Sequence, residues 1–196
     1  MPRNDISEWL IHFTKGDDDE AAFQTLRTIM AERRLVGGVG GIRGGYRCVC
    51  FTEAPLTSMV HGFANPEGFT RYSRYGVMIA KSYIYNLGGR PVVYGSSDEF
   101  DGLGGLQWRH VRYEPSSASP IDFTWEREWR VCRDELSLDP EVARIIVPDH
   151  ASAQRMTDEF DGEQEALVQT YSQVMDPLLA EQYQERWPWL VAVLDG

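Results

Sequence analysis

Residues 122–132, DFTWEREWRVC, alternate between apolar and polar side chains, and this stretch decides the fold class. A repeat of two residues is typical of a β-strand with one face on a core. One face joins Arg127 to four apolar side chains, those of Phe123, Trp125, Trp129 and Val131. The opposite face carries the side chains of Thr124, Glu126, Glu128, Arg130 and Cys132. We therefore expect the tryptophans in the core and the glutamates facing either solvent or a cleft.

Further strands and helices are predicted on both sides of this stretch. Short runs rich in β-branched and aromatic residues predict strands at 8–14, 46–53, 75–80, 91–94 and 144–147. Helices are predicted at 19–35, ended by Gly37-Gly38, at 81–87, and at 151–186 with interruptions near Gly162 and Pro177. The final apolar run, 187–194, fits a strand or the start of a buried helix. The chain reads as a single α+β domain, 1–196, with a cleft-forming core over 1–148 and a helical portion over 149–196.

Two stretches between these elements are candidate loops. Residues 37–45, GGVGGIRGG, hold six glycines but lack the Gly-Lys-Ser/Thr of a phosphate-binding loop. The stretch is either a mobile surface loop or a loop that closes over a ligand. Residues 95–120 are polar and rich in Gly, Ser and Pro, which predicts a long loop that is functional or disordered.

Charge is distributed unevenly along the 196 residues, whose net charge is −11. The first 100 residues hold 11 basic and 11 acidic side chains, whereas residues 101–196 hold 8 and 19. The acidic half disfavours broad binding of nucleic-acid phosphates, with a local patch of Arg71, Arg74 and Arg90 left as an exception, and it suits a basic partner protein. The sequence has neither a membrane-spanning apolar run nor a secretory signal pattern, so we expect a cytoplasmic protein.

Cysteine and histidine give no metal-site spacing. Cys48, Cys50 and Cys132 predict free thiols, and Cys48-x-Cys50 has no second ligand pair, so we expect no metal. His12 lies inside the apolar run WLIHFT. It is either a hydrogen-bonded core residue or a ligand-binding group.

Five short strings together resemble the abortive phage-resistance (AbiGi-type) family. In chain order they are HFT (12–14), CFTEAPL (50–56), YGVMIAK (75–81), GGRPVVY (88–94) and EREWR (126–130). These motifs fall within residues 9–131, about two thirds of the chain. More distantly, the pattern is similar to ADP-ribosyltransferase folds, especially toxins that modify DNA bases.

This resemblance implies split mixed or antiparallel β-sheets around a cleft with flanking helices. It implies NAD as a substrate, Glu128 and Glu126 as catalytic residues, and an acceptor that is a nucleic acid or a protein. The residues implied to bind NAD are His12, Phe13, Thr14, Phe51 and Thr52, with Tyr75 or Tyr94 stacking on nicotinamide. The role implied is phage defence or toxicity. The alternatives are a non-catalytic antitoxin or partner-binding module of the same fold, and an α+β enzyme of an unrelated class such as a hydrolase.

Overall fold

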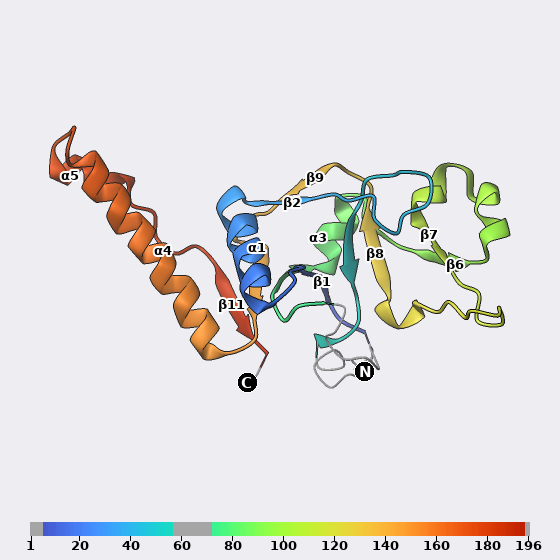
Figure 1. Cartoon of the computed structure of the whole chain (residues 1–196). Helices are drawn as coiled ribbons and strands as arrows, with labels where there is room; N and C mark the ends of the chain where they lie inside the picture. Colours follow the sequence, from blue (N-terminus) through green and yellow to red (C-terminus); the bar gives the residue numbers. More distant parts are fainter. Residues whose placement is uncertain (1–5, 57–71, 195–196) are drawn as a thin grey trace.

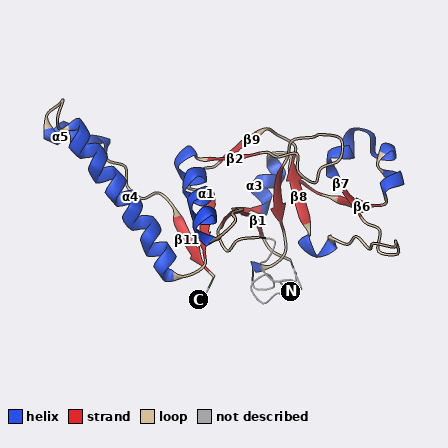
Figure 2. Ribbon diagram, viewed as in Figure 1, coloured by secondary structure: helices blue, strands red, loops and turns tan. Residues whose placement is uncertain are grey.

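The computed structural model describes residues 6–56 and 72–194, and within them seven strands form a central mixed sheet. Its strand order is β11-β10-β4-β1-β3-β8-β5, antiparallel except for the parallel pair β10 and β11. The strands are β1 (Trp9–Phe13), β3 (Val49–Thr52), β4 (Gly76–Ala80), β5 (Arg90–Pro91), β8 (Glu128–Val131), β10 (Ala143–Val147) and β11 (Leu190–Val193). Helices flank this sheet, as Figure 2 shows, so the predicted α+β class is confirmed.

Helix α1 (Asp19–Glu32) begins and ends at residues with clear backbone roles. The side chain of Asp18 accepts the Ala21 N–H and caps the first turn. The helix ends at Arg33, whose left-handed φ of 49° turns the chain into β2 (Arg34–Val36). The predicted helix was therefore too long at its end: Arg33 ends it, and Leu35 is buried on β2, which pairs with β9 (Glu135–Ser137).

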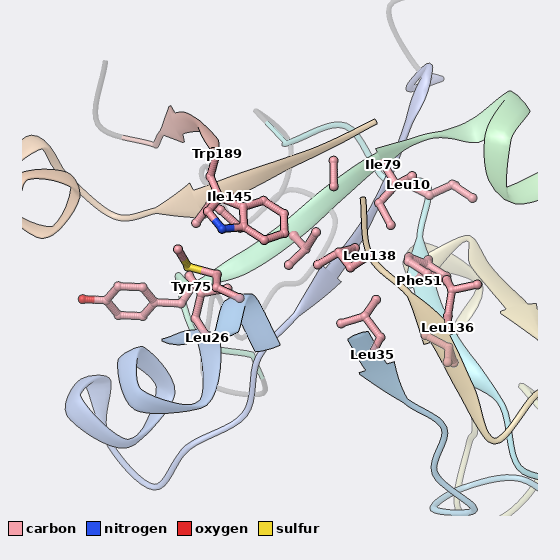
Figure 3. Packing of buried hydrophobic residues seen from close by; sticks show 14 of the residues in the cluster. Leu10, Leu26, Leu35, Phe51, Tyr75, Ile79, Leu136, Leu138, Ile145 and Trp189 are labelled. Carbon is pink, nitrogen blue, oxygen red and sulfur yellow. The ribbon is translucent and has the colours of Figure 1, made fainter. Parts of the chain in front are cut away.

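The main hydrophobic core lies between one face of the sheet and the helices. Side chains from α1, β2 and the sheet meet there, including Leu26, Leu35, Leu10 and Ile79 (Figure 3). Helix α3 (Lys81–Asn86) adds Ile84 to the same cluster. A second, smaller core covers the opposite face and consists of Ile11, Phe13, Ala54, Met78 and Ile146.

Residues 122–132 do not form one continuous strand, so this prediction was wrong in its first half. Thr124–Glu126 is a 3₁₀ turn, η4, and Arg127 has a left-handed φ of 45°. The cause is Asp122, whose carboxylate accepts the backbone N–H and the hydroxyl of Thr124 and so competes with strand pairing. As a result Trp129 joins the main core, whereas Trp125 packs against the second core.

Residues 95–120 are more ordered than the predicted loop. They contain two 3₁₀ segments, η2 (Ser97–Glu99) and η3 (Asp101–Arg109), followed by β7 (His110–Arg112). Strand β7 pairs in parallel with β6 (Val93–Gly95). This small sheet stands beside the end of the central sheet that β8 and the edge strand β5 form (Figure 1).

The C-terminal region forms an arm that projects from the body (Figure 1). Helix α4 (His150–Tyr171) is continuous, so the predicted interruption near Gly162 was wrong. An isolated glycine weakens a helix by only about 1 kcal/mol relative to alanine, which the capped N-terminus at Asp149 helps to offset. The break before Pro177 is confirmed, and α5 (Pro177–Ala180) and η5 (Glu181–Tyr183) lead back along α4 to β11.

Candidate functional site

A cavity of about 860 Å³ is lined by residues of α1, β1, β2, β3, β7 and β8. Its volume lies in the range of small-molecule and cofactor sites. All but two of the residues predicted to form the site line it: His12, Phe13, Thr14, Phe51, Thr52, Glu126 and Glu128. The two exceptions are Tyr75 and Tyr94.

The cavity lies where the central sheet opens between β1 and β3. These two strands share a single register pair, Ile11 with Thr52, whereas β1 and β4 pair along five positions. Beyond that pair, His12 spans the two strands, with its ring Nδ1 2.8 Å from the Cys50 carbonyl oxygen. A side chain thus makes the contact between β1 and β3 where their backbone pairing stops.

His12 and Glu128 line the same cavity but come from opposite faces of the sheet. Thr52 is in register with both Ile11 and Glu128, so these three side chains share one face. His12 follows Ile11 and therefore lies on the other face. The cavity is lined from both faces, so it reaches through the opening between β1 and β3.

Glu128 is held by Arg130 on the same face of β8. Arg130 Nε lies 2.8 Å from Glu128 Oε1 and Nη2 lies 3.1 Å from Oε2, a bidentate pair. The Arg130 side chain is only 3% exposed, and its Nη1 also donates to the carbonyl oxygens of Trp108 and His110. Burial acts to lower the pKa of Arg130, but the hydrogen bonds and charge of Glu128 outweigh it and hold this pKa above its ordinary value.

Tyr94 contacts the backbone of Glu128 and does not line the cavity. Its hydroxyl oxygen accepts the backbone N–H of Glu128 at 3.1 Å. Burial raises the pKa of Tyr94 to about 12, so the phenol is neutral at physiological pH. The predicted stacking on nicotinamide is not supported for Tyr94, because this residue does not line the cavity and instead positions the start of β8.

Tyr75, the second candidate for stacking, is a core residue and does not line the cavity either. Its ring packs edge-on against Phe23 at 5.8 Å, and its hydroxyl lies 3.2 Å from that of Ser152. The aromatic side chains that do line the cavity besides Phe13 and Phe51 are Tyr72 and Phe123. Tyr72 follows a stretch of sequence without clear periodicity, so no local pattern pointed to it.

Both threonines that are predicted to bind a ligand have structural hydrogen bonds. The Thr52 hydroxyl donates to the Glu126 carbonyl oxygen and accepts the Ala54 N–H, which fixes η4 against β3. The Thr14 hydroxyl lies within hydrogen-bond distance of the carbonyl oxygens of Ala22 and Tyr75. Both residues line the cavity, but their hydroxyl groups already tie neighbouring segments together.

The His12 ring is positioned as a neutral acceptor. Since the Cys50 carbonyl oxygen can only accept, Nδ1 carries the hydrogen and Nε2 has the lone pair. Removal of the ring from water lowers the pKa of His12 below its ordinary value of 6.5, a shift that the Cys50 hydrogen bond opposes and the nearby Lys15 charge assists. The ring also meets Phe51 edge-on at 6.0 Å.

The glycine-rich segment contributes to the cavity wall. Gly38, Gly40 and Gly41 line the cavity, and a Cβ added at any of them would meet no atom within 4 Å. Gly41 has φ of 72°, a conformation that other residues rarely adopt. The segment therefore borders the candidate site, and both hypotheses, a mobile surface loop and a loop that closes over a ligand, remain open.

Two arginines of the basic patch suggested by the sequence contact other residues of the chain in the structure. Arg74 forms an ion pair with Asp19, and Arg90 stacks on Tyr85 at 3.9 Å. Arg71 lies outside the described residues. The part of the chain that the structure describes holds no group of three or more His, Cys, Asp or Glu side chains arranged to bind a metal.

No family model, curated protein or solved structure matches the chain. Within residues 6–56 and 72–194, no helix has the length and apolar character needed to cross a membrane.

Proposed function

We propose that the protein is an ADP-ribosyltransferase-like enzyme that cleaves the nicotinamide–ribose bond of NAD. The observation that carries this proposal is the convergence of Glu128, Glu126 and His12 on one cavity at the opening of the sheet. The cavity volume of about 860 Å³ suits a dinucleotide. The expected ADP-ribosyltransferase-like fold, with its split sheet around a cleft, is part of this proposal.

Glu128 is the proposed catalytic carboxylate. Breaking the glycosidic bond of NAD develops positive charge on the ribose, and a preorganised carboxylate stabilises that charge. Arg130 fixes the carboxylate through two hydrogen bonds, and the Tyr94 hydroxyl fixes the backbone of the same residue. Such rigid support is what a preorganised electrostatic group requires.

The remaining walls match the other parts of the substrate. The neutral His12 ring, through Nε2, accepts a hydrogen bond from an amide or ribose hydroxyl. Phe13, Tyr72 and Phe123 supply an aromatic surface for nicotinamide or adenine. Lys15 and Arg112 supply positive charge for the pyrophosphate.

Glu126 is the proposed second carboxylate, which orients or deprotonates the acceptor. It lies in η4 and is buried at the cavity wall. The acceptor is a nucleic acid or a protein, and the resemblance to abortive phage-resistance proteins gives phage defence or toxicity in the cytoplasm as the setting.

Release of nicotinamide from NAD by the purified chain tests the proposal. We expect Glu128→Gln to lower turnover by about 10²–10³-fold, the loss typical of one preorganised electrostatic group. The matched control is Glu159→Gln on α4, which changes a carboxylate outside the cavity and should leave turnover unchanged. A denaturant melt of each variant separates lost chemistry from lost folding. A folded wild-type protein that neither binds NAD nor releases nicotinamide contradicts the proposal.

The arm favours a second candidate, a non-catalytic module that binds a basic partner protein. Residues 150–186 hold 8 acidic and 2 basic side chains. Large apolar side chains are exposed near the tip, namely Val174, Leu178, Leu179 and Tyr183. NAD binding without turnover, in a chain whose arm is needed for function in cells, would favour this candidate.

A further inference from the structure

Cys48 and Cys132 lie opposite each other across strands β3 and β8. The register of these strands pairs Val49 with Val131, so the preceding residue Cys48 faces the following residue Cys132. The side chains of the two cysteines are in hydrogen-bond contact. Both are free thiols in the structure.

The backbone hydrogen bonds define which kind of pair this is. In this register Glu53 lies opposite Arg127, and its N–H donates to the Arg127 carbonyl oxygen. Every second residue pair along two antiparallel strands, counted from this one, exchanges such backbone hydrogen bonds. Cys48 falls between such pairs, and its own N–H and carbonyl bond Gly38 on the side away from β8. The cysteines therefore form a non-hydrogen-bonded pair, in which Cα atoms are about 4.5 Å apart. That spacing lies within the range of disulfide bonds, about 4.4–6.8 Å.

We propose that Cys48 and Cys132 are a modification site that a peroxide oxidises to a cross-strand disulfide. The Cys132 thiolate attacks one peroxide oxygen, so that the O–O bond breaks, an S–O bond forms and water leaves after protonation. The Cys48 sulfur then attacks the Cys132 sulfur, which forms the S–S bond and releases the second water. Two thiols and one hydrogen peroxide thus give one disulfide and two waters, with both electrons passing from sulfur to oxygen.

The exposure of the cysteines sets the order of these steps. Cys132 is exposed and meets the oxidant first, whereas Cys48 is only 2% exposed. Burial raises the pKa of Cys48 to about 12, an effect that the nearby Arg130 charge opposes. Cys48 is therefore suited to resolve the oxidised Cys132 rather than to react with peroxide itself.

Cys50 lines the cavity of the candidate site but is not part of the Cys48–Cys132 pair. It is in register with Arg130, and its thiol is in hydrogen-bond contact with Glu128. Burial, followed by the negative charge of Glu128, raises the pKa of Cys50 far above its ordinary value. Cys50 is thus the matched control for the test.

The disulfide would act on the cavity through Gly38. Cys48 and Gly38 form a backbone bridge at the start of the glycine-rich segment, and both residues line the cavity. A bond between β3 and β8 next to this bridge fixes the base of that segment. The inference does not depend on NAD chemistry, because the pair and its oxidation are defined by the strands alone.

Peptide mapping of the full chain after treatment with hydrogen peroxide and then iodoacetamide tests the proposal. Trypsin releases Cys132 in peptide 131–133 and both Cys48 and Cys50 in peptide 48–71. We expect these peptides to be joined, with a loss of two hydrogens that dithiothreitol reverses. Fragmentation at Val49 assigns the bond to Cys48, and the oxidised chain should melt up to about 10 °C higher than the reduced chain.

Two variants decide the outcome. Cys50→Ser should still form the joined peptide, and Cys132→Ser, a change at an exposed residue, should abolish it. The proposal is overturned if Cys132 accumulates only sulfinic acid, if the bond joins Cys50, or if Cys132→Ser still forms an intramolecular disulfide.

Discussion

Replacing Glu128 by glutamine should destabilise the fold, because it removes the negative charge beside a buried guanidinium. Loss of one partner of a buried ion pair costs about 3–5 kcal/mol. Glutamine still offers a carbonyl oxygen to one of the two Arg130 N–H groups, and Arg130 keeps its bonds to the Trp108 and His110 carbonyls. We therefore expect the low end of that range, about 3 kcal/mol.

A double-mutant cycle with Arg130→Met separates the pair from its surroundings. Arg130→Met alone leaves two buried carbonyl groups and the Glu128 carboxylate without their donor, which should cost about 5 kcal/mol. The double variant should cost about the same as Arg130→Met alone, because that change has already removed the pair. The coupling free energy is then about 3 kcal/mol.

Urea unfolding followed by tryptophan fluorescence measures these differences. With m-values of about 1–3 kcal/mol/M, Glu128→Gln should lower the midpoint by at least about 1 M. The control Glu159→Gln removes a half-buried carboxylate that forms surface ion pairs with Arg27 and Arg155, and its cost should stay within about 1 kcal/mol. Additive effects in the cycle, or a Glu128→Gln variant as stable as the control, would show that the ion pair does not stabilise the fold.

Three further outcomes are expected. Trp129→Ala should cost about 3–5 kcal/mol in urea melts, because the ring lies in the main core and donates to Glu53, whereas Trp125→Ala at the second core should cost less than half of that. The pKa of His12 in the folded state lies below its value in the unfolded state, so the unfolded state binds the proton first and stability falls as pH drops below about 6.5. Urea melts at several pH values should show this fall for the wild type and not for His12→Asn, which keeps an N–H for the Cys50 carbonyl oxygen. NAD at 100 times its Kd should stabilise the fold by about 2.7 kcal/mol and raise Tm by roughly 5–10 °C in a thermal shift assay, and an unchanged Tm in millimolar NAD would count against the enzyme.

The elements that could be predicted are those whose signals are local. Helix α1 follows from the carboxylates at 17–20, among which Asp18 is the cap, and from apolar residues at helical spacing, of which Phe23, Leu26 and Met30 are buried. Strands β1, β4 and β10 follow from short apolar runs, and each lies inside or within one residue of its predicted range. These patterns suffice because capping and one-sided burial act within a few residues of the chain.

Features that depend on distant contacts could not be predicted. Tyr75 has the same aromatic character as Tyr72, but only packing on Phe23 decides that Tyr75 belongs to the core. Arg130 looked like one more polar residue on the exposed side of a strand. Its guanidinium donates to the carbonyl oxygens of Trp108 and His110, and these two residues belong to a segment that was predicted to be a loop.

The five residues of the string EREWR meet five different structural demands. Glu126 ends a 3₁₀ turn, Arg127 takes a left-handed conformation, Glu128 lines the cavity, Trp129 enters the core and Arg130 is buried. Glu126 and Glu128 therefore do not lie on one continuous strand, as the alternation predicts.

The Arg130 contact is compatible with catalysis by Glu128. Each carboxylate oxygen has two lone pairs, and Arg130 occupies one on each oxygen. The Cys50 thiol contacts a third lone pair, and the fourth remains able to accept a ribose hydroxyl while the guanidinium prevents rotation of the group. A side chain held in this way pays no reorganisation when charge develops on the substrate. Arg130 therefore orients the carboxylate, and the same contact that makes Glu128→Gln unstable is the one that would make Glu128 effective.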